Sequence, residues 1–417
     1  MRLLFYNHAP EISGAERSLL ALAAHARAAG HDVTLCVPPG PLADATTDAA
    51  IPCAAVTPLV LGRSRNPLVL TRYLVNAATP ITELVRVVRA VRPDIVHANS
   101  IRSGLVAAAA LRLARVHDRP GPRLVVHARD ALRGGVPDGA VAGILNHDAD
   151  AVIAISRHVA WRMGSTHKTR VLHNAVDPDR YRRDEGAGQA LRQRLGIPGE
   201  APLLAVAAQL SPWKGQLDAL EAFALLRATH PDAHLVVAGV VKFTGKHCRY
   251  DNLRYYDALV ARAARADLRG YAHLVGDISD VVALYSAATL LVVPSWAEPF
   301  GRVVVEAMAA GCPVLATRAG GIPEIVTHGV DGWLTPPRDP AALARALALL
   351  LNDRALRARL ALHGRATVRE RFALSDYMET LEAVWDDVYS GQVTTTPTIA
   401  PQREVSASLT RESRAAS

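Results

Sequence analysis

The sequence is poor in cysteine and in aromatic residues. Its four cysteines, Cys36, Cys53, Cys248 and Cys312, are scattered along 417 residues and form no C-x-x-C pair. This spacing indicates neither a disulfide framework nor a zinc knuckle, and it fits a protein of the reducing cytoplasm. Aromatic residues make up 5% of the chain, whereas half of it is hydrophobic, with many Ala, Val and Leu. Such a composition favours helices that alternate with buried strands.

Long apolar runs are also missing. No stretch reaches about 18 uninterrupted apolar residues, so no segment is expected to span a bilayer. A single Arg precedes the run LLF at residues 3–5, which is far too short for the apolar region of a signal peptide. We therefore expect a cytoplasmic protein.

Several catalytic motifs are absent as well. No G-x-G-x-x-G follows the first expected strand, which argues against an NAD enzyme. Neither H-E-x-x-H nor G-x-S-x-G occurs, and the sequence shows no cluster of metal ligands. We expect neither a metal ion nor a cofactor.

The net charge of +8 is shared unevenly along the chain. Residues 1–178 hold 20 Lys and Arg against 13 Asp and Glu, a net charge of +7. This asymmetry favours an anionic partner, such as an anionic membrane surface, a phosphorylated substrate or nucleic acid, but a solvated Arg-rich surface explains it equally well. We expect no nucleic acid, because charge is its only support and no platform of aromatic and basic residues accompanies it.

One segment of this half, residues 57–92, mixes Leu and Val with Arg63, Arg65, Arg72, Arg86, Arg89 and Arg92. A basic segment at an interface would dock on anionic lipid headgroups, which predicts peripheral contact with the inner face of the membrane. In the alternative, the apolar residues face the core and the arginines face water.

Short apolar runs alternate with helical patterns along most of the chain. In the first half, strands are expected at 2–6, 32–37, 94–98, 123–128 and 151–156, and helices at 15–29, 81–92 and 103–115. In the second half, strands are expected at 203–210, 234–239, 273–276, 290–295 and 313–317, and helices at 216–228, 253–266, 279–287, 301–310, 323–328 and 340–362. Steady alternation of strand and helix predicts parallel, doubly wound sheets.

A chain of this length is too long for one ordinary core. We predict two Rossmann-like α/β domains, at residues 1–178 and 199–372, that face each other across a cleft. A helix within residues 373–390 follows them. Residues 391–417 are rich in Thr, Ser, Ala and Pro without an apolar period, which predicts a disordered tail.

Two carboxylates, Glu298 and Glu306, stand in the stretch AEPFGRVVVEAMAAGCPVLATRAGGIPEIV at residues 297–326. The strand expected at 290–295 ends just before Glu298, so Glu298 lies in a loop at the carboxyl end of a strand. Open α/β sheets bind their ligands at that end. Glu306 lies in the helix that follows the loop.

The start of that helix offers the N–H groups of Gly301, Arg302 and Val303 as a site for a phosphate. Carboxylates beside it would repel a bare phosphate, so we expect them to accept hydrogen bonds from hydroxyls. A nucleotide sugar has a diphosphate between two such polyols and fits. The alternative is a Glu that balances the helix dipole and a second Glu exposed to solvent.

The arrangement E-P-F-G-x-x-x-x-E, followed by A-x-A-x-G-x-P-V-x-A-T-x-x-G-G-x-x-E-I-V, closely resembles the donor-binding signature of the retaining glycosyltransferases of family 4. These enzymes have the GT-B fold, in which two Rossmann-like domains face each other. The resemblance extends over about residues 1–390 and implies that the helix at 374–390 crosses back to the first domain.

The resemblance implies a role for further residues. Gly14 would approach the donor diphosphate or the acceptor, and His127 would lie beside the transferred sugar, although a His at a strand end is often structural. Lys214 would neutralise the diphosphate, while Gln209 stands where the family has an Arg. The implied donor-binding residues are Gly14, Gln209, Lys214, Val275, Glu298, Phe300, Gly301, Arg302, Val303 and Glu306, and the implied catalytic residues are His127, Lys214 and Glu298.

The function that the resemblance implies is metal-independent transfer of a sugar, with retention, from a nucleoside-diphosphate sugar to a hydroxyl acceptor, in the synthesis of a surface polysaccharide, a glycolipid or a glycosylated metabolite. Glu298 would hold the hydroxyls of the sugar, and Glu306 those of the ribose. Two alternatives stay open. One is a phosphorylase or disaccharide synthase of the same fold, and the other is a non-catalytic protein that binds nucleotide sugars.

Overall fold

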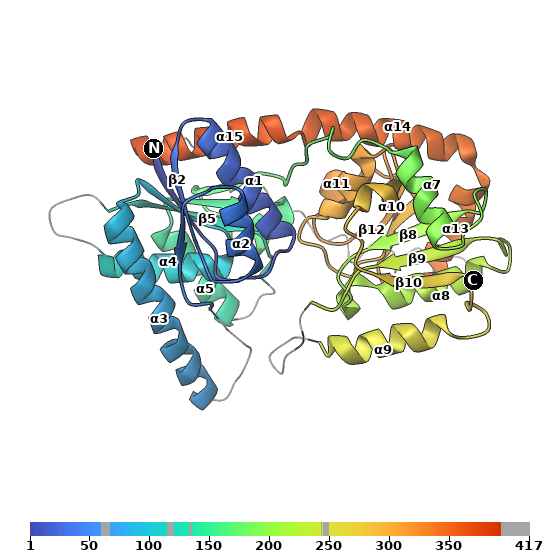
Figure 1. Ribbon diagram of the computed structural model, residues 1–417, viewed down its shortest axis with the longest axis horizontal. Helices are drawn as coiled ribbons and strands as arrows, with labels where there is room; N and C mark the ends of the chain where they lie inside the picture. The colour runs from blue at the N-terminus through green and yellow to red at the C-terminus, as the bar shows by residue number, and fades with distance from the viewer. Residues whose placement is uncertain (60–66, 115–120, 133–135, 243, 245–249, 393–417) are drawn as a thin grey trace, which may run out of the picture.

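The computed structural model of the protein describes residues 1–59, 67–114, 121–132, 136–242, 244 and 250–392, with the backbone alone for residues 67–75. Two lobes lie side by side, and each is built on one sheet (Figure 1). The predicted disordered tail lies outside the described residues, except for its first two positions.

The sheet of the first lobe has the strand order β3-β2-β1-β4-β5-β6-β7, and its strands pair in parallel. The strands are β1 (Arg2–Tyr6), β2 (Asp32–Val37), β3 (Cys53–Ala55), β4 (Ile95–Ala98), β5 (Arg123–Ala128), β6 (Ala151–Ala154) and β7 (Thr169–Val171). The helices between them are α1 (Gly14–Ala28), α2 (Pro41–Asp48), α3 (Pro67–Val91), α4 (Ile101–Ala114), α5 (Val136–Asp148) and α6 (Arg157–Arg162).

Both faces of this sheet are buried, because successive residues of each strand point to opposite sides. Leu3 and Phe5 of β1 pack with residues of α1, α2 and the last helix of the chain. Leu4 and Tyr6 pack with residues of α3, α4 and α5 on the other face. Because both faces of the sheet are covered, the sequences of its central strands are continuous apolar runs, and this pattern made them predictable.

The sheet of the second lobe has the order β10-β9-β8-β11-β12-β13, again with parallel pairs. Its strands are β8 (Leu203–Ala207), β9 (His234–Ala238), β10 (Ala272–Gly276), β11 (Leu290–Val293), β12 (Val314–Thr317) and β13 (Trp333–Thr335). Its helical elements are α7 (Glu185–Arg194), η1 (Pro212–Lys214), α8 (Gln216–Leu226), α9 (Asn252–Ala263), α10 (Val281–Ala287), α11 (Arg302–Ala309), α12 (Ile322–Ile325), α13 (Pro340–Asn352) and α14 (Arg354–Arg371). The six strands of this sheet follow the order of the first six strands of the first lobe, which adds β7 at its edge, and the first strand of each lobe is in an inner position.

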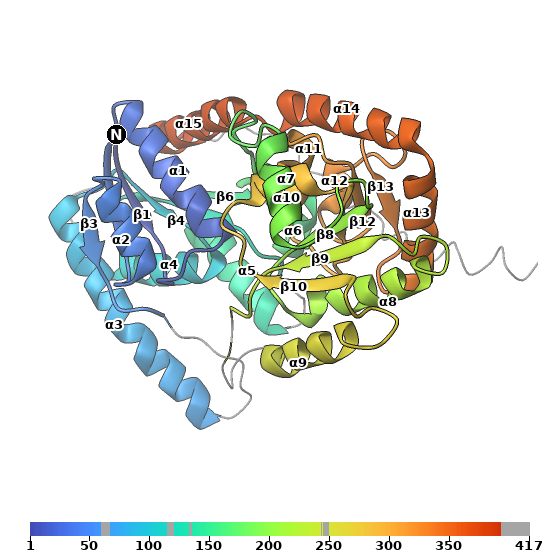
Figure 2. The same cartoon turned by 45° about the vertical axis from the view of Figure 1, so that its right-hand side comes forward.

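The last helix, α15 (Leu374–Ser390), belongs to the core of the first lobe. In Figure 2, α14 lies over the second lobe and α15 over the first. The chain crosses between the lobes twice, and the two crossings are bonded to each other: the N–H of Val176 donates to the carbonyl of Phe372, and the N–H of Leu374 donates to that of Val176. Apolar contacts also run from one lobe to the other without interruption.

The helix expected at 340–362 is wrong, because the structure has two helices there, α13 and α14. Asp353 ends the first helix and caps the second, since its side chain accepts a hydrogen bond from the N–H of Leu356 at 2.7 Å. Elements that the sequence did not predict include the short edge strands β3, β7 and β13 and the helices α2, α5, α6 and α7. Helix α7 packs on α10: a Cβ at Gly188 would lie 2.9 Å from the backbone N of Ala287.

The predicted basic segment at 57–92 is described only in part. Leu84, Val85 and Val88 of α3 are buried in the core, while Arg86 and Arg89 are exposed. Over this part of α3 the structure follows the alternative in which arginine faces water. Arg63 and Arg65, and the side chain of Arg72, lie outside what the structure describes. Among the described residues, no helix has both the length and the apolar character of a membrane span.

Candidate nucleotide-sugar site

The loop between β11 and α11 is fixed by close backbone contacts. Gly320 has a φ of 57°, and a Cβ there would lie 2.0 Å from the carbonyl oxygen of Glu298. The next residue, Gly321, donates its N–H to the same carbonyl at 2.8 Å. On the other side of the loop, a Cβ at Gly215 would lie 2.0 Å from the carbonyl oxygen of Pro294. Glycine is therefore required at both contacts, and the loop is held at Glu298 by Gly320 and just after β11, at Pro294, by Gly215.

Glu298 forms a buried ion pair with Lys214. Its Oε2 atom accepts hydrogen bonds from Nζ of Lys214 at 2.6 Å and from Oγ of Ser295 at 3.2 Å. The side chains of Glu298 and Lys214 are 9% and 14% exposed. Nζ of Lys214 also lies 4.2 Å from the centre of the Trp213 ring. The sequence predicted both residues for one site, and the structure brings them together.

This pair lines a small pocket at the carboxyl ends of β8 and β11, together with Val303 of α11. Helix α11 begins here, after Gly301 with a φ of 114°. The first N–H groups of a helix have no acceptor within the helix. The N–H of Val304 is turned back to the carbonyl of Gly301 at 2.9 Å, whereas those of Gly301, Arg302 and Val303 have no acceptor among the described residues. The positive end of the α11 dipole, a lysine and a carboxylate thus meet in one pocket.

Glu306, one and a half turns into α11, lies in a ring of donors. Its Oε1 atom accepts from Nε of Arg302 at 2.7 Å and from the hydroxyl of Tyr181 at 3.0 Å, and its Oε2 atom accepts from the hydroxyl of Tyr285 at 3.0 Å. Burial and the charge of Glu306 raise the pKa of Tyr285 well above its ordinary value. Both tyrosines therefore stay protonated and donate. The alternative to a binding role required Glu306 to be exposed to solvent, but the structure buries it.

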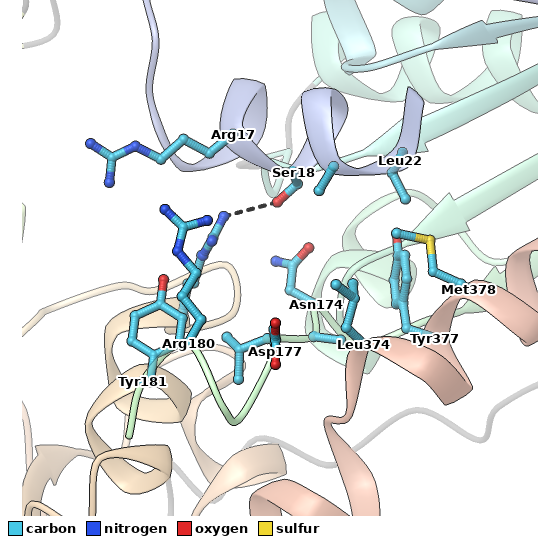
Figure 3. A pocket seen from close by; sticks show the side chains of 14 residues that line it. Arg17, Ser18, Leu22, Asn174, Asp177, Arg180, Tyr181, Leu374, Tyr377 and Met378 are labelled. Carbon is cyan, nitrogen blue, oxygen red and sulfur yellow. Dashed lines mark hydrogen bonds between the residues drawn. The ribbon is translucent and has the colours of Figure 1, made fainter. Parts of the chain in front are cut away.

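Arg302 connects the two lobes. Its Nη1 atom donates to the carbonyl of Gly14 at 2.9 Å and to Oγ of Ser18 at 3.0 Å, both in α1; the second of these bonds is the dashed line in Figure 3. Burial alone would lower the pKa of Arg302, but the carboxylate of Glu306 raises it above its ordinary value. The guanidinium is thus a fixed cation between α1 and α11.

The contact with Gly14 bears on the prediction that this glycine approaches a ligand. The carbonyl of Gly14 is occupied by Arg302, and a Cβ at this position would lie 3.9 Å from the nearest atom, Cδ of Arg302. There is room for a small side chain in this arrangement. Next to this contact, a second pocket opens between the lobes, lined by Arg17, Asn174, Asp177, Arg180 and Tyr377, which Figure 3 shows around it.

His127 lies near the carboxyl end of β5 and is fully buried. Its Nδ1 atom lies 3.3 Å from Nε2 of His97, while its Nε2 atom has no hydrogen-bond partner among the described residues. Burial, then the charge of Arg129 and His97, lower the pKa of His127 well below its ordinary value, so the ring is neutral. In the part of the chain that the structure describes, no hydrogen bond or ion pair joins His127 to Glu298 or Lys214.

Three more predicted residues are less closely tied to the pocket. The carbonyl of Gln209 accepts a hydrogen bond from Nε2 of Gln216 at 2.9 Å, and the side chain of Gln209 is half-buried. Val275 is half-buried in β10. The ring of Phe300 is 2% exposed and stacks on His173 at 5.7 Å, so only the backbone of Phe300 is available to a ligand.

Sequence reasoning missed the residues that fasten the site to the first lobe. The carboxylate of Glu324 accepts hydrogen bonds from the N–H groups of Arg157 and His158 at 2.7 and 2.8 Å, and from Nε2 of His173 at 2.9 Å. Oγ of Ser156 donates to the carbonyl of Pro299 at 2.6 Å. Burial would raise the pKa of Glu324, but these donors lower it below its ordinary value. Glu324 stood in the quoted motif, yet its spacing gave no sign of contact with α6.

The family profile described as Glycosyltransferase Family 4 matches residues 12–180, and that described as Glycosyl transferases group 1 matches residues 188–367. The chain belongs to the family 4 glycosyltransferases. The predicted resemblance and the GT-B fold are thereby confirmed.

Individual family 4 relatives include a D-inositol 3-phosphate glycosyltransferase of Streptomyces avermitilis, 35% identical over 59% of this chain and 50% of the relative. A glycogen synthase of Mycobacterium tuberculosis is 32% identical over 68% of this chain and 66% of the relative. The chain thus spans about half the length of the first of these relatives. The crystal structure of HepE from Anabaena with UDP-glucose is similar with a TM-score of 0.78 and 26% identity, over 93% of this chain and 100% of that one.

Metal ligation finds no support in the described residues. They contain no group of three or more His, Cys, Asp or Glu side chains that could hold an ion. Lys214, Arg302 and the start of α11 supply positive charge at the site.

Proposed function

We propose that the protein is a retaining glycosyltransferase that moves a sugar from a nucleoside-diphosphate sugar to a hydroxyl acceptor, without a metal ion or cofactor. The observation that carries this proposal is the pocket in which the buried pair Glu298–Lys214 meets the open start of α11. HepE, which was crystallised with UDP-glucose, shares the fold over nearly the whole described chain and supports a nucleotide-sugar donor.

In this proposal the diphosphate binds the N–H groups of Gly301, Arg302 and Val303 and the ammonium of Lys214. Departure of the nucleoside diphosphate builds negative charge on its oxygens, and donors fixed in place before the reaction stabilise that charge without rearranging. The ion pair with Glu298 holds the ammonium in place. The remaining lone pairs of Glu298 accept hydrogen bonds from hydroxyls of the sugar.

Because Gln209 is neutral, the site has one positive charge fewer than a site with Arg at this position. Arg302 does not replace the missing cation directly, because its guanidinium is bound to Glu306 and α1. We infer that Lys214 carries most of the side-chain charge that stabilises the leaving group. Gln209 contributes a neutral amide.

The nucleoside is assigned to the far end of the same site. Glu306 has one lone pair of Oε2 left after its bonds to Arg302, Tyr181 and Tyr285, and we propose that a ribose hydroxyl uses it. The backbone near Val275 reads the base. Glu306→Gln should then raise the Michaelis constant for the nucleotide sugar, and an unchanged value would remove the ribose assignment.

The acceptor is assigned to the first lobe, with His127 beside the transferred sugar. The acceptor class that we propose, a precursor of a surface polysaccharide, a glycolipid or a metabolite, would be met in the cytoplasm, for lipid-linked acceptors at the inner face of the membrane. Arg86 and Arg89 are exposed and available to anionic headgroups, whereas the apolar face of this part of α3 is used by the core. Flotation with phosphatidylglycerol vesicles tests this: binding that falls with salt supports membrane contact, and no binding ends the idea.

The test of the proposal is a thermal-shift screen of nucleotide sugars that begins with UDP-glucose, followed by an assay of transfer. A ligand at 100 times its dissociation constant stabilises the folded protein by about 2.7 kcal/mol. Glu298→Gln should abolish transfer. Leu349→Ala on the exposed side of α13 serves as the control and should leave transfer unchanged.

The same assay separates the two alternatives. Phosphate-dependent release of sugar 1-phosphate would indicate a phosphorylase, and donor binding without hydrolysis or transfer to any acceptor would indicate a non-catalytic protein.

A further inference from the structure

Three buried side-chain rings, those of Trp385, His97 and His127, are linked in series from the last helix into the first lobe. Nε1 of Trp385 in α15 donates to Nδ1 of His97 in β4 at 3.1 Å. Nε2 of His97 lies 3.3 Å from Nδ1 of His127 in β5. Trp385 is 1% exposed, and both histidines are fully buried.

The direction of this series of rings is set by its first member. An indole nitrogen can only donate, so Nδ1 of His97 must accept and carries no proton. Burial and the charge of Arg129 lower the pKa of His97 to about 3, so its ring is neutral and its single proton sits on Nε2. That N–H donates to Nδ1 of His127. The neutral ring of His127 then has its proton on Nε2 as well.

The N–H group of His127 is the last donor in this series of rings. Nε2 of His127 is buried and has no partner among the described residues. Arg129, just beyond the end of β5, is also buried, but its guanidinium has partners: its Nε and Nη1 atoms donate to Asn99 and Asn174, and it interacts with the hydroxyl of Tyr377. Asn174 lines the pocket between the lobes. An unpartnered buried donor such as Nε2–H of His127 is rare in folded proteins, and a catalytic role or a small bound group such as a water are among its explanations.

We propose that Trp385 is a positioning residue: through His97 it holds the proton of His127 on Nε2, so that His127 offers the sugar donor an N–H group and not a base. This assignment of the receiving group rests on the proposed function, whereas the proton arrangement does not. His127 would then donate to an oxygen of the bound donor and take no proton from the acceptor. The helix that crosses back from the donor lobe thereby sets the chemistry of a residue in the acceptor lobe.

A purely structural role for Trp385 predicts something different. An aromatic ring that only fills space could be replaced by phenylalanine without any change in the proton position on His127. The packing of Trp385 against Phe5, with ring centres 5.8 Å apart, would be kept in large part by that replacement. The N–H is the part of Trp385 on which the proposal depends.

The test reads the proton position directly, by nitrogen NMR of the full chain labelled at histidine. His127→Gln and His97→Gln spectra assign the two rings. In the wild type we expect Nε2 of both rings to be protonated and both Nδ1 atoms to be bare. Trp385→Phe and His97→Leu should each produce a mixture of proton positions on His127, because nothing then holds the proton on Nε2.

His97→Gln is the rescue variant. Its amide oxygen can accept from Trp385 and its amide N–H can donate to His127, so Nε2 of His127 should stay protonated. Leu381→Ala, on the buried face of α15, is the packing control and should lower the thermal midpoint without changing the proton position. With UDP-glucose as the donor, Trp385→Phe should lower kcat/KM about twofold to tenfold, the value of one hydrogen bond.

A proton on Nδ1 of His127 in the wild type would overturn the proposal, and so would an unchanged Nε2–H population in both Trp385→Phe and His97→Leu. The ligand-free spectra decide this whether or not a nucleotide sugar binds. Failure of UDP-glucose and the other nucleotide sugars to bind would count against the proposed function alone.

Discussion

The buried pair of Lys214 and Glu298 allows stability and activity to be separated. Each side chain is less than one sixth exposed, and their charged atoms lie 2.6 Å apart. Removing one partner of such a pair leaves the other charge buried and uncompensated, which typically costs about 3–5 kcal/mol. For a lobe of this size a cost of 1 kcal/mol lowers the thermal midpoint by about 2–4 °C, so Lys214→Met and Glu298→Gln should each lower it by about 6–20 °C.

The double variant behaves differently in the two assays. With both charges gone, no carboxylate or ammonium is left unpaired, and most of the lost stability should return. Transfer should not return, because the cation at the leaving group is missing in both Lys214→Met and the double variant. Loss of one preorganised donor typically costs about 10²–10³ in rate.

The measurements are thermal midpoints and initial rates with a saturating nucleotide sugar, for the wild type, the two single variants and the double variant. Recovery of both stability and rate in the double variant would show that the pair is only structural. Single variants that lose less than about 1 kcal/mol would show that the pair is solvated, as surface pairs are, and would refute the reasoning on burial.

Three further predictions follow from single contacts. Gly320→Ala should destabilise the protein far more than Gly270→Ala and should abolish donor-induced stabilisation. Both glycines have positive φ, but only a Cβ at Gly320 would meet a carbonyl oxygen, that of Glu298 at 2.0 Å. Equal thermal midpoints for the two variants would contradict this close contact. Tyr285→Phe should cost about 1–3 kcal/mol in chemical denaturation, since it leaves Oε2 of the buried Glu306 without its donor, whereas Tyr389→Phe, at the exposed end of α15, should cost nothing. Glu324 has a lowered pKa in the folded protein, so its stabilising effect is complete above its unfolded pKa and is lost as the pH falls through the folded value. The difference in thermal midpoint between wild type and Glu324→Gln should therefore shrink on acidification below about pH 4.5. A difference that grows would show that the pKa of Glu324 is raised and not lowered by folding.

The sequence predicted what short segments decide by themselves. The central strands of both sheets are apolar runs bounded by polar residues, and the position of Glu298 follows from one strand, one loop and one helix in succession. The break at Asp353 was missed because the apolar period continues through it, although an Asp before a helix is a local capping signal. The edge strands β3, β7 and β13 have three residues each, which is too short for an alternating pattern.

Contacts between distant segments could not be predicted in this way. Tyr181 and Tyr285 reach Glu306 from 125 and 21 residues away, and nothing in their own surroundings marks them as its partners. The same holds for Trp385, which meets His97 from 288 residues away. Tyr285 and Glu306 lie in two helices of the second lobe, α10 and α11, which the fold of that lobe brings together, whereas the return of the chain to the first lobe brings Trp385 to His97.

The placement of α15 has a consequence for synthesis on the ribosome. The first lobe contains β1 but lacks Trp385, Leu381 and Met378 of its own core until the second lobe has been made, because α15 follows that lobe in the chain. At 5–20 residues per second the interval between completion of β7 and emergence of α15 is roughly 10–40 s. During that time the part of the first sheet that α15 covers is exposed, although α1 and α2 already cover the rest of that face, so we expect nascent chains that stall within the second lobe to be captured by chaperones.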